Sequence, residues 1–340
     1  VGRGGHAAAD AAARVVYACR TEAAELFDAV PEQIVFTMNA THGLNIALRS
    51  LVRPGGRVVL SGMEHNAVTR PLAALGAQIE TAGAPPFAPE RLLEGFARAL
   101  RQGAAAAVCT HVSNVYGNVL PVSAIAALCR ERGVPLIIDA SQSAGTLPVS
   151  LSGTGAAFIA MPGHKGLYGP QGTGLLLCGA AGEPLLLGGT GSNSLDQSMP
   201  DFLPDRHEAG THNVCGIGGL LAGLRFVRER RPEELLAVER ALTALAARGL
   251  RQLPGVEVFT GPGQCGVLSF RCRDLDCEEA AARLAEAGIA VRAGLHCAPM
   301  AHRSGGTLET GTVRVSFSAF NTSAEVRQFL QVCRTAFLPG

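Results

Sequence analysis

The sequence predicts an α/β fold in which a mostly parallel sheet is flanked by helices, followed by a smaller α+β region. In the first two-thirds of the chain, six short runs rich in Val, Ile and Leu are bounded by Gly, Pro or polar residues, as buried strands are. Helical patterns separate these runs, and such alternation is typical of parallel sheets with helices on both faces. From about Cys215 the pattern changes to a long helical stretch and then to a mixture of short strands and helices.

Each predicted element has a defined place in the chain. The predicted strands of the first part cover residues 33–37, 57–62, 104–112, 135–141, 156–161 and 172–178, with helices over 41–52, 89–103 and 121–133. A helical pattern then runs through 216–253, and strands over 256–261, 265–272, 290–294 and 312–318 follow, with helices over 277–288 and from about Ser323. We therefore expect a large domain over 1–225, and a helical hinge with a small C-terminal α+β domain over 226–340.

The composition narrows the class of function. Of 340 residues, 47% are hydrophobic and 17% charged, which excludes a disordered chain. The net charge is +1, no basic block interleaves with aromatic residues, and nucleic acid is not an expected partner. No apolar run reaches the roughly 20 residues that cross a bilayer, so no membrane interaction is expected. The first six residues lack the layout of a signal peptide, and we expect a cytoplasmic protein.

The ten cysteines indicate reduced thiols rather than a disulfide framework. Most of them, such as Cys109 and Cys178, lie inside apolar runs, where a thiol behaves as a small core residue. There is no CxxC pair and no spacing typical of a zinc site. No metal centre is therefore expected.

Polar side chains follow several predicted strands at the points where those strands end. These residues are His65, Asn114, Asp139, Gln142, His164 and Lys165. In open α/β sheets, ligands bind beyond the carboxyl ends of the strands. The sequence therefore predicts one site at this edge of the sheet.

The residue types at this edge suit pyridoxal 5'-phosphate (PLP). The ring of this cofactor needs a carboxylate at its nitrogen, which Asp139 supplies, and a lysine that forms a Schiff base, which Lys165 supplies. The imidazole of His65 can stack on the ring and move protons, and the helix that starts near Thr41 offers backbone N–H groups to the phosphate. Each residue taken alone has another interpretation. Asp139 could be a helix N-cap, Lys165 a solvated loop lysine, and the histidines ordinary surface or core residues. Their order and shared location favour the cofactor.

Six motifs resemble a known family. In chain order they are DASQSAG (139–145), GHKGLYGPQGTG (163–174), GGTGSNS (188–194), HEAGTHN (207–213), VRAGLHCAP (291–299) and VRVSFSAFNT (313–322). Together they resemble the fold-type-I class V aminotransferase superfamily, a group of PLP-dependent enzymes. Within it the chain looks most like the cysteine desulfurases, the branch shared with the selenocysteine lyases. The similarity covers nearly the whole chain.

The resemblance implies a role for each cofactor-binding residue. Lys165 would carry the cofactor, Asp139 would pair with the ring nitrogen, and Gln142 would bind the ring hydroxyl. His65 would stack on the ring and take part in proton transfer. Phosphate contacts are implied for Thr41 and His164, and for Thr211 toward the phosphate of a neighbouring subunit.

The substrate-binding and nucleophilic residues are implied in the same way. Asn114 lies where the family has a residue near the ring and the substrate, and Arg314 would hold the substrate carboxylate, a task suited to a guanidinium. Cys297 corresponds to the nucleophilic cysteine of the family. Arg292 is also expected to bind the substrate. Arg292 and His296 are close to Cys297 in sequence and are candidates for activating its thiol.

The activity that the resemblance implies is the conversion of L-cysteine to L-alanine, with a persulfide formed on Cys297. The sulfur would pass to an acceptor protein for iron–sulfur cluster or thio-cofactor assembly, and the enzyme would be a homodimer. A selenocysteine lyase or a class V aminotransferase is an alternative, and a transaminase has no use for a thiol at position 297. An inactive scaffold protein is an alternative of another class.

Three features depart from the family pattern. Pro162 stands where many relatives have a phosphate-binding serine, so the phosphate would rely on other donors. The N-terminal segment of the family is absent before Val1, which suggests a shortened form. Residues 301–311 are expected to form a mobile loop, or a place where specificity differs.

Overall fold

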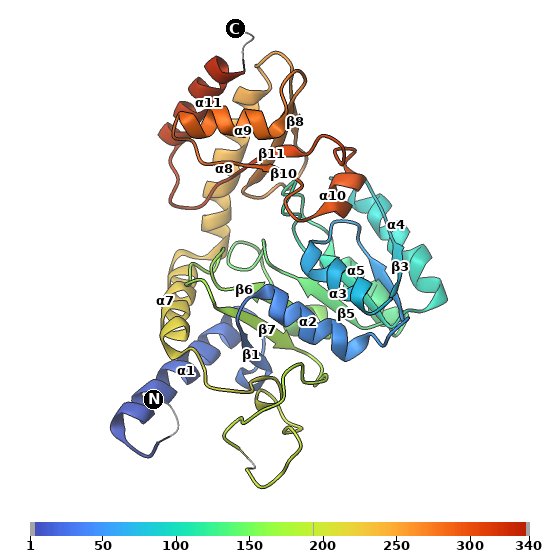
Figure 1. Ribbon diagram of the computed structural model, residues 1–340, viewed down its shortest axis with the longest axis vertical. Coiled ribbons are helices and arrows are strands. Elements are labelled where there is room, and N and C mark those ends of the chain that lie inside the picture. The colour runs from blue at the N-terminus through green and yellow to red at the C-terminus, as the bar shows by residue number, and fades with distance from the viewer. Residues whose placement is uncertain (1–3, 193, 338–340) are drawn as a thin grey trace.

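The computed structural model describes residues 4–192 and 194–337, so Asn193 of the GGTGSNS motif lies outside the described residues. Two separate sheets organise the chain, one of seven strands and one of four. Figure 1 shows the seven-stranded sheet in the lower body of the molecule and the four-stranded sheet at the upper end, with α7 and α8 leading from one to the other. The predicted α/β fold class is confirmed.

The seven-stranded sheet is mostly parallel. Its order is β1-β7-β6-β5-β4-β2-β3, and only the pairings of β7 with β1 and with β6 are antiparallel. The strands are β1 (Ile34–Thr37), β2 (Arg57–Leu60), β3 (Gln78–Thr81), β4 (Ala106–Thr110), β5 (Leu136–Asp139), β6 (Phe158–Pro162) and β7 (Gly174–Cys178). Because β2, β4, β5 and β6 run parallel as neighbours, their carboxyl ends meet along one edge.

Helices cover both faces of this sheet. Because side chains point alternately to the two faces along each strand, they divide between two apolar clusters. In β6, Ile159 and Met161 belong to one apolar cluster, whereas Phe158 and Ala160 belong to another. The first cluster includes side chains of α1 (Ala7–Leu26), α4 (Pro89–Ala99), α5 (Val122–Glu131) and α7 (Val214–Arg230). The second includes side chains of α2 (Ala40–Leu51) and α3 (Asn66–Ala74). The four-residue helix α6 (Leu151–Thr154) lies between β5 and β6.

The smaller sheet is antiparallel, in the order β10-β11-β9-β8. Its strands are β8 (Val256–Phe259), β9 (Val267–Cys272), β10 (Arg292–Gly294) and β11 (Thr312–Ser316), and it packs with α8 (Pro232–Leu250), α9 (Cys277–Glu286) and α11 (Ser323–Ala336) around an apolar cluster of its own. The short helix α10 (Pro299–Ser304) precedes β11. The position of the domain boundary at residue 225 stays a prediction.

The single helical stretch predicted over 216–253 is instead two helices. They meet at Arg231, which has a φ of 63°. Pro232 follows as the first residue of α8, and its ring prevents it from donating the backbone hydrogen bond that a continuous helix needs. The proline therefore ends α7 and sets a new direction for α8.

Other differences from the expectations have physical causes. The edge strand β3 is mostly exposed and carries no apolar run, so the pattern did not indicate it. The helices α1 and α3 were not predicted either. The segment expected to be a mobile loop over 301–311 is a packed one, because it contains the end of α10 and because Ala301, His302 and Thr307 are fully buried. No helix among the described residues is long and apolar enough to cross a membrane.

Candidate active site

A pocket opens at the carboxyl ends of β4 and β5, where Thr110 and Asp139 line it. Seven of the residues predicted for the site line it, namely Thr41, His65, Asn114, Asp139, Gln142, His164 and Lys165. The parallel strands thus bring together side chains that are up to 124 residues apart in the chain (165 minus 41).

Lys165 lies in the loop between β6 and β7, and glycines fix that loop against the segment that follows β5. A Cβ atom on Gly145, which has a φ of 91°, would lie 1.9 Å from the carbonyl oxygen of Gly166. Only glycine permits this approach. Burial lowers the pKa of Lys165, the charge of Arg314 acts in the same direction, and that of Asp139 opposes it. The amine is therefore more readily uncharged, and more nucleophilic, than an exposed lysine.

His65 stands at the N-terminus of α3, where its ring caps the helix. Its Nδ1 accepts a hydrogen bond of 3.0 Å from the amide of Ala67. An accepting Nδ1 carries no proton, so the ring is neutral with its proton on Nε2. Burial lowers the pKa of His65, and this favours the same neutral form. The Nε2–H group is then the proton that His65 can donate.

The N-terminus of α2 forms another wall of the pocket. Asn39 caps this helix by accepting from the amide of His42 at 2.9 Å, and Asn39, Ala40 and Thr41 all line the pocket. The first amides of a helix have no acceptor within the helix and attract anions. Pro162 lines the same pocket and offers no N–H group, so the donors at this end are the helix, Thr41 and His164.

Arg314 stands on β11, at the junction between the two sheets. Its Nη1 donates to the backbone carbonyl of Asn114 at 3.0 Å, which holds the guanidinium beside the pocket. Burial lowers the pKa of Arg314, and the neighbouring charge of Arg292 acts in the same direction. The two guanidinium groups therefore make this side of the site positive.

Cys297 follows β10 and lies near this positive side. Its thiol is exposed, and Nη2 of Arg292 lies 3.8 Å from Sγ. His296 and Cys297 both have left-handed backbones, with φ of 50° and 55°. Two hydrogen bonds hold this segment, from Asn114 Nδ2 to the carbonyl of His296 at 2.8 Å and from the amide of Asn66 to the carbonyl of Cys297 at 2.7 Å.

The ring of His296 contacts Thr312 on β11. Its Nε2 lies 3.1 Å from Oγ1 of Thr312, and its side chain is buried. Burial lowers the pKa of His296 to about 3, so the ring is neutral at physiological pH. Of the two candidates for activating Cys297, the structure therefore favours Arg292 and argues against His296.

Comparisons with known proteins identify the family of this chain. The family described as "Aminotransferase class-V" matches the chain over residues 1–329. The chain belongs to the class-V aminotransferase family. A "Probable cysteine desulfurase" of Methanothermobacter thermautotrophicus is 33% identical, over 96% of this chain and 84% of the relative. A protein of the same description from Xylella fastidiosa is 31% identical, over 97% and 82%.

Solved structures show the same likeness. The apo structure of a cysteine desulfurase from Thermococcus onnurineus NA1 matches with a TM-score of 0.90 and 31% identity, over 98% of this chain and 86% of that one. The cysteine desulfurase CsdA from Escherichia coli matches with a TM-score of 0.87 and 27% identity, over 99% and 87%. The class-V family is PLP-dependent.

The pocket of this class-V chain fits such a cofactor. Thr110 and Asn114 line the pocket, and Oγ1 of Thr110 and Oδ1 of Asn114 are buried atoms without a hydrogen-bond partner among the described residues. An unpaired buried polar atom costs about 1–3 kcal/mol, and a bound polar molecule removes that cost. A carboxylate, a buried lysine and a helix N-terminus stand around the same space.

Thr211 lies away from this pocket. It lines a second pocket with Met38, Leu186 and His212 among others. The loop between β7 and α7 projects from the body of the molecule, as the yellow-green segment in Figure 1 shows. The single chain therefore does not bring Thr211 to the other predicted residues.

Sequence reasoning missed several residues that line the main pocket. These are Asn39, Ala40, Ala67, Thr110, Val112 and Ser141. Thr110 is paired with Asp139 in the parallel register of β4 and β5, so a strand-pairing argument could have found it. Asn39 lies two residues before the helix predicted over 41–52, and asparagine is a favoured N-cap residue, so it was identifiable as the cap.

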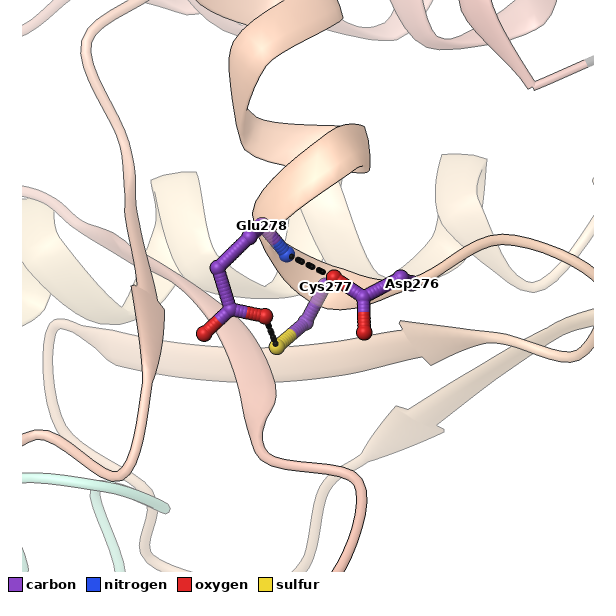
Figure 2. Close-up of side chains that lie close together, drawn as sticks. All are labelled: Asp276, Cys277 and Glu278. Carbon is purple, nitrogen blue, oxygen red and sulfur yellow. Dashed lines mark hydrogen bonds between the residues drawn. The ribbon is translucent and has the colours of Figure 1, made fainter.

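A separate cluster of possible metal ligands lies at the N-terminus of α9, where Figure 2 shows Asp276, Cys277 and Glu278. Asp276 caps the helix, because Oδ1 accepts from the amide of Glu278 at 2.8 Å, and Sγ of Cys277 donates to Glu278 at 2.9 Å. Burial raises the pKa of Cys277 to about 11, which keeps this thiol protonated at physiological pH. These contacts account for the cluster as a helix cap.

Proposed function

We propose that this chain is a PLP-dependent cysteine desulfurase that converts L-cysteine to L-alanine and leaves a persulfide on Cys297. The observation that carries the proposal is the exposed thiol of Cys297, 3.8 Å from the Arg292 guanidinium, in a segment bonded to Asn114, which lines the same pocket as Lys165. A transaminase needs the lysine and has no use for the thiol. The names of the relatives described above support the same reaction.

Each residue of the pocket has a task in this proposal. Lys165 is the attachment point, Asp139 binds the ring nitrogen and Gln142 the ring hydroxyl, and His65 stacks on the ring. Thr41, His164 and the first amides of α2 bind the phosphate. When bound, the cofactor supplies an electron sink for charge that develops on the substrate. Arg314 binds the substrate carboxylate, with Asn114 beside it.

The sulfur transfer is a displacement at the sulfur of the substrate. The thiolate of Cys297 attacks that sulfur, a new S–S bond forms and the Cβ–S bond breaks. The electron pair of the broken bond stays on the substrate carbon, which takes up a proton to become the methyl group of alanine. Arg292 stabilises the attacking thiolate, and Nζ of Lys165 and Nε2 of His65 are the groups that move protons.

We further propose that the enzyme works as a homodimer and passes its sulfur to an acceptor protein. The projecting loop exposes Leu186, Leu187, Leu195 and Phe202, which are 45–100% accessible in the single chain. Exposed apolar side chains gathered in one segment are typical of an interface. A second copy that covers this loop would bring Thr211 toward the neighbouring phosphate.

The test combines absorption spectra with product analysis. The purified protein should be yellow after incubation with PLP and should form alanine from L-cysteine. Lys165→Ala should remove the colour, whereas Cys297→Ala should keep the colour and lose alanine and persulfide. A yellow protein that forms no alanine from L-cysteine but transfers its amino group to a keto acid would instead be an aminotransferase. Light scattering during size-exclusion chromatography gives the molar mass and so tests whether the protein is a dimer.

A further inference from the structure

Glu64 is a fully buried acid that the proposed reaction does not use. It stands in the turn after β2, one residue before His65. Its Oε1 accepts from the amide of Ser61 at 2.9 Å and from the Ser61 hydroxyl, and its Oε2 accepts from the amide of Gly62 at 2.8 Å. Three donors on one carboxyl group fix the shape of this turn, residues 61–66, which we call the Glu64 turn.

The Glu64 turn is bonded to the segment that carries Cys297. The amide of Asn66 donates to the carbonyl of Cys297 at 2.7 Å. At the other end of α10, the hydroxyl of Ser304 donates to the carbonyl of Gly62 at 3.0 Å. The turn therefore holds α10 and the preceding cysteine at two points.

The conformation of Cys297 needs such support. A left-handed backbone at a residue other than glycine costs roughly 1 kcal/mol, and it persists when the surrounding contacts hold it. The bonds from Asn66 and Asn114 help to hold residues 296 and 297, together with the contact of the His296 ring with Thr312 and the bond from the amide of Ala298 to the carbonyl of Leu295. Asn66 belongs to the Glu64 turn, so the place of the thiol depends on the shape of that turn.

We propose that Glu64 is a positioning residue that sets the place of Cys297 relative to His65 and the pocket, through the turn that contains His65 and binds Cys297. The effect of Glu64 on catalysis rests on the proposed function. Movement of a reacting group by about 1 Å can lower a rate by two orders of magnitude. The turn therefore links the residue that stacks on the ring with the nucleophile that attacks the substrate.

The central test is Glu64→Gln, which keeps the shape of the side chain and replaces one acceptor oxygen with a donor NH2 group. That group faces donors of Ser61 or Gly62, so at least one of the three bonds is lost. We expect hydrogen exchange to accelerate at least about ten-fold in peptides that cover residues 61–66 and 295–305. We expect kcat for alanine formation to fall roughly ten-fold or more, with KM within about two-fold, because Arg314 is not part of the turn.

Two further variants keep the test decisive. Ser304→Ala removes only the bond to Gly62 and should accelerate exchange in 295–305 while leaving the visible spectrum of the bound cofactor unchanged. Glu239→Gln is the matched control, since Glu239 is a buried acid on α8 with no bond to the turn among the described residues. It should leave exchange in 295–305 as in the wild type.

Wild-type exchange over 295–305 in both Glu64→Gln and Ser304→Ala would overturn the proposal, and so would equal acceleration in Glu239→Gln. Exchange is measured on the PLP-loaded protein without substrate. A chain that forms no alanine from L-cysteine would thus refute the proposed function while the result for Glu64 still stands.

Discussion

The backbone carbonyl of Asn114 accepts a hydrogen bond of 3.0 Å from Nη1 of Arg314, which joins the segment after β4 to strand β11 of the other sheet. The same Asn114 donates its side-chain amide to the carbonyl of His296. One residue of the turn after β4 therefore contacts both the guanidinium proposed to bind the substrate and the loop of the proposed nucleophile.

Replacing Arg314 with lysine should raise the KM for L-cysteine roughly ten-fold or more, because an ammonium cannot bond Asn114 and a carboxylate in the same planar arrangement. The visible spectrum of the bound cofactor should stay unchanged. Steady-state alanine formation measures the effect, with the exposed Arg303→Lys on α10 as the control. An unchanged KM would show that Arg314 does not bind the substrate.

The rate of cofactor attachment to the apoprotein should rise with pH, with a midpoint below the ordinary lysine pKa of 10.5. Only the uncharged amine attacks, and burial lowers the pKa of Lys165, so the reactive form appears at lower pH. Arg314→Gln removes a charge that also lowers this pKa and should move the midpoint upward. The growth of the visible band after mixing with PLP measures the attachment rate at each pH. A midpoint that is the same in Arg314→Gln as in the wild type would contradict this electrostatic coupling.

Thr110→Val should change two properties in opposite directions. The apoprotein should gain about 1 kcal/mol of unfolding free energy, because the variant removes a buried hydroxyl that has no partner among the described residues. Affinity for PLP should fall about five-fold, because the hydroxyl then no longer bonds the bound molecule. Thermal melts and cofactor titrations measure the two effects, and Thr110→Ser should keep the affinity. Equal affinity in the valine variant would mean that the hydroxyl does not face the cofactor.

Arg20→Met should lower the unfolding free energy by about 3–5 kcal/mol, because the buried carboxylate of Glu208 loses its guanidinium partner and keeps only the amide of Phe36 and the ring of His212. Arg20 bonds both oxygens of Glu208, at 3.0 and 2.8 Å, and thereby ties α1 to the segment before Thr211. Urea denaturation measures the loss. The exposed pair of Arg283 and Glu279 is the comparison, where Arg283→Met should cost less than about 1 kcal/mol.

The sequence predicted the large sheet well because its central strands are buried on both faces and therefore read as apolar runs. The same reasoning failed for β3, which is exposed at the edge, and for the break at Arg231. The site residues at strand ends were predictable because parallel strands end along one edge. Thr110 was missed because it lies inside the run predicted as a strand over 104–112, whereas the observed strand β4 ends at this residue.

Contacts that depend on local backbone shape were beyond the sequence. His296 precedes the thiol in sequence, yet the left-handed backbone turns its ring toward Thr312. The three bonds of Glu64 require a turn that no spacing rule indicates. Adjacency in sequence is thus a poor guide to contact wherever the chain reverses within one or two residues.

The residues proposed for the reaction come from two sheets, each packed around apolar clusters of its own. Arg292 and Arg314 stand on the four-stranded sheet, whereas Asp139 ends a strand of the seven-stranded one. Partial unfolding often follows such units. If the smaller core opens first on gentle heating, the protein would stay yellow while it stops making alanine, so colour alone would overstate how much working enzyme a heated sample still contains.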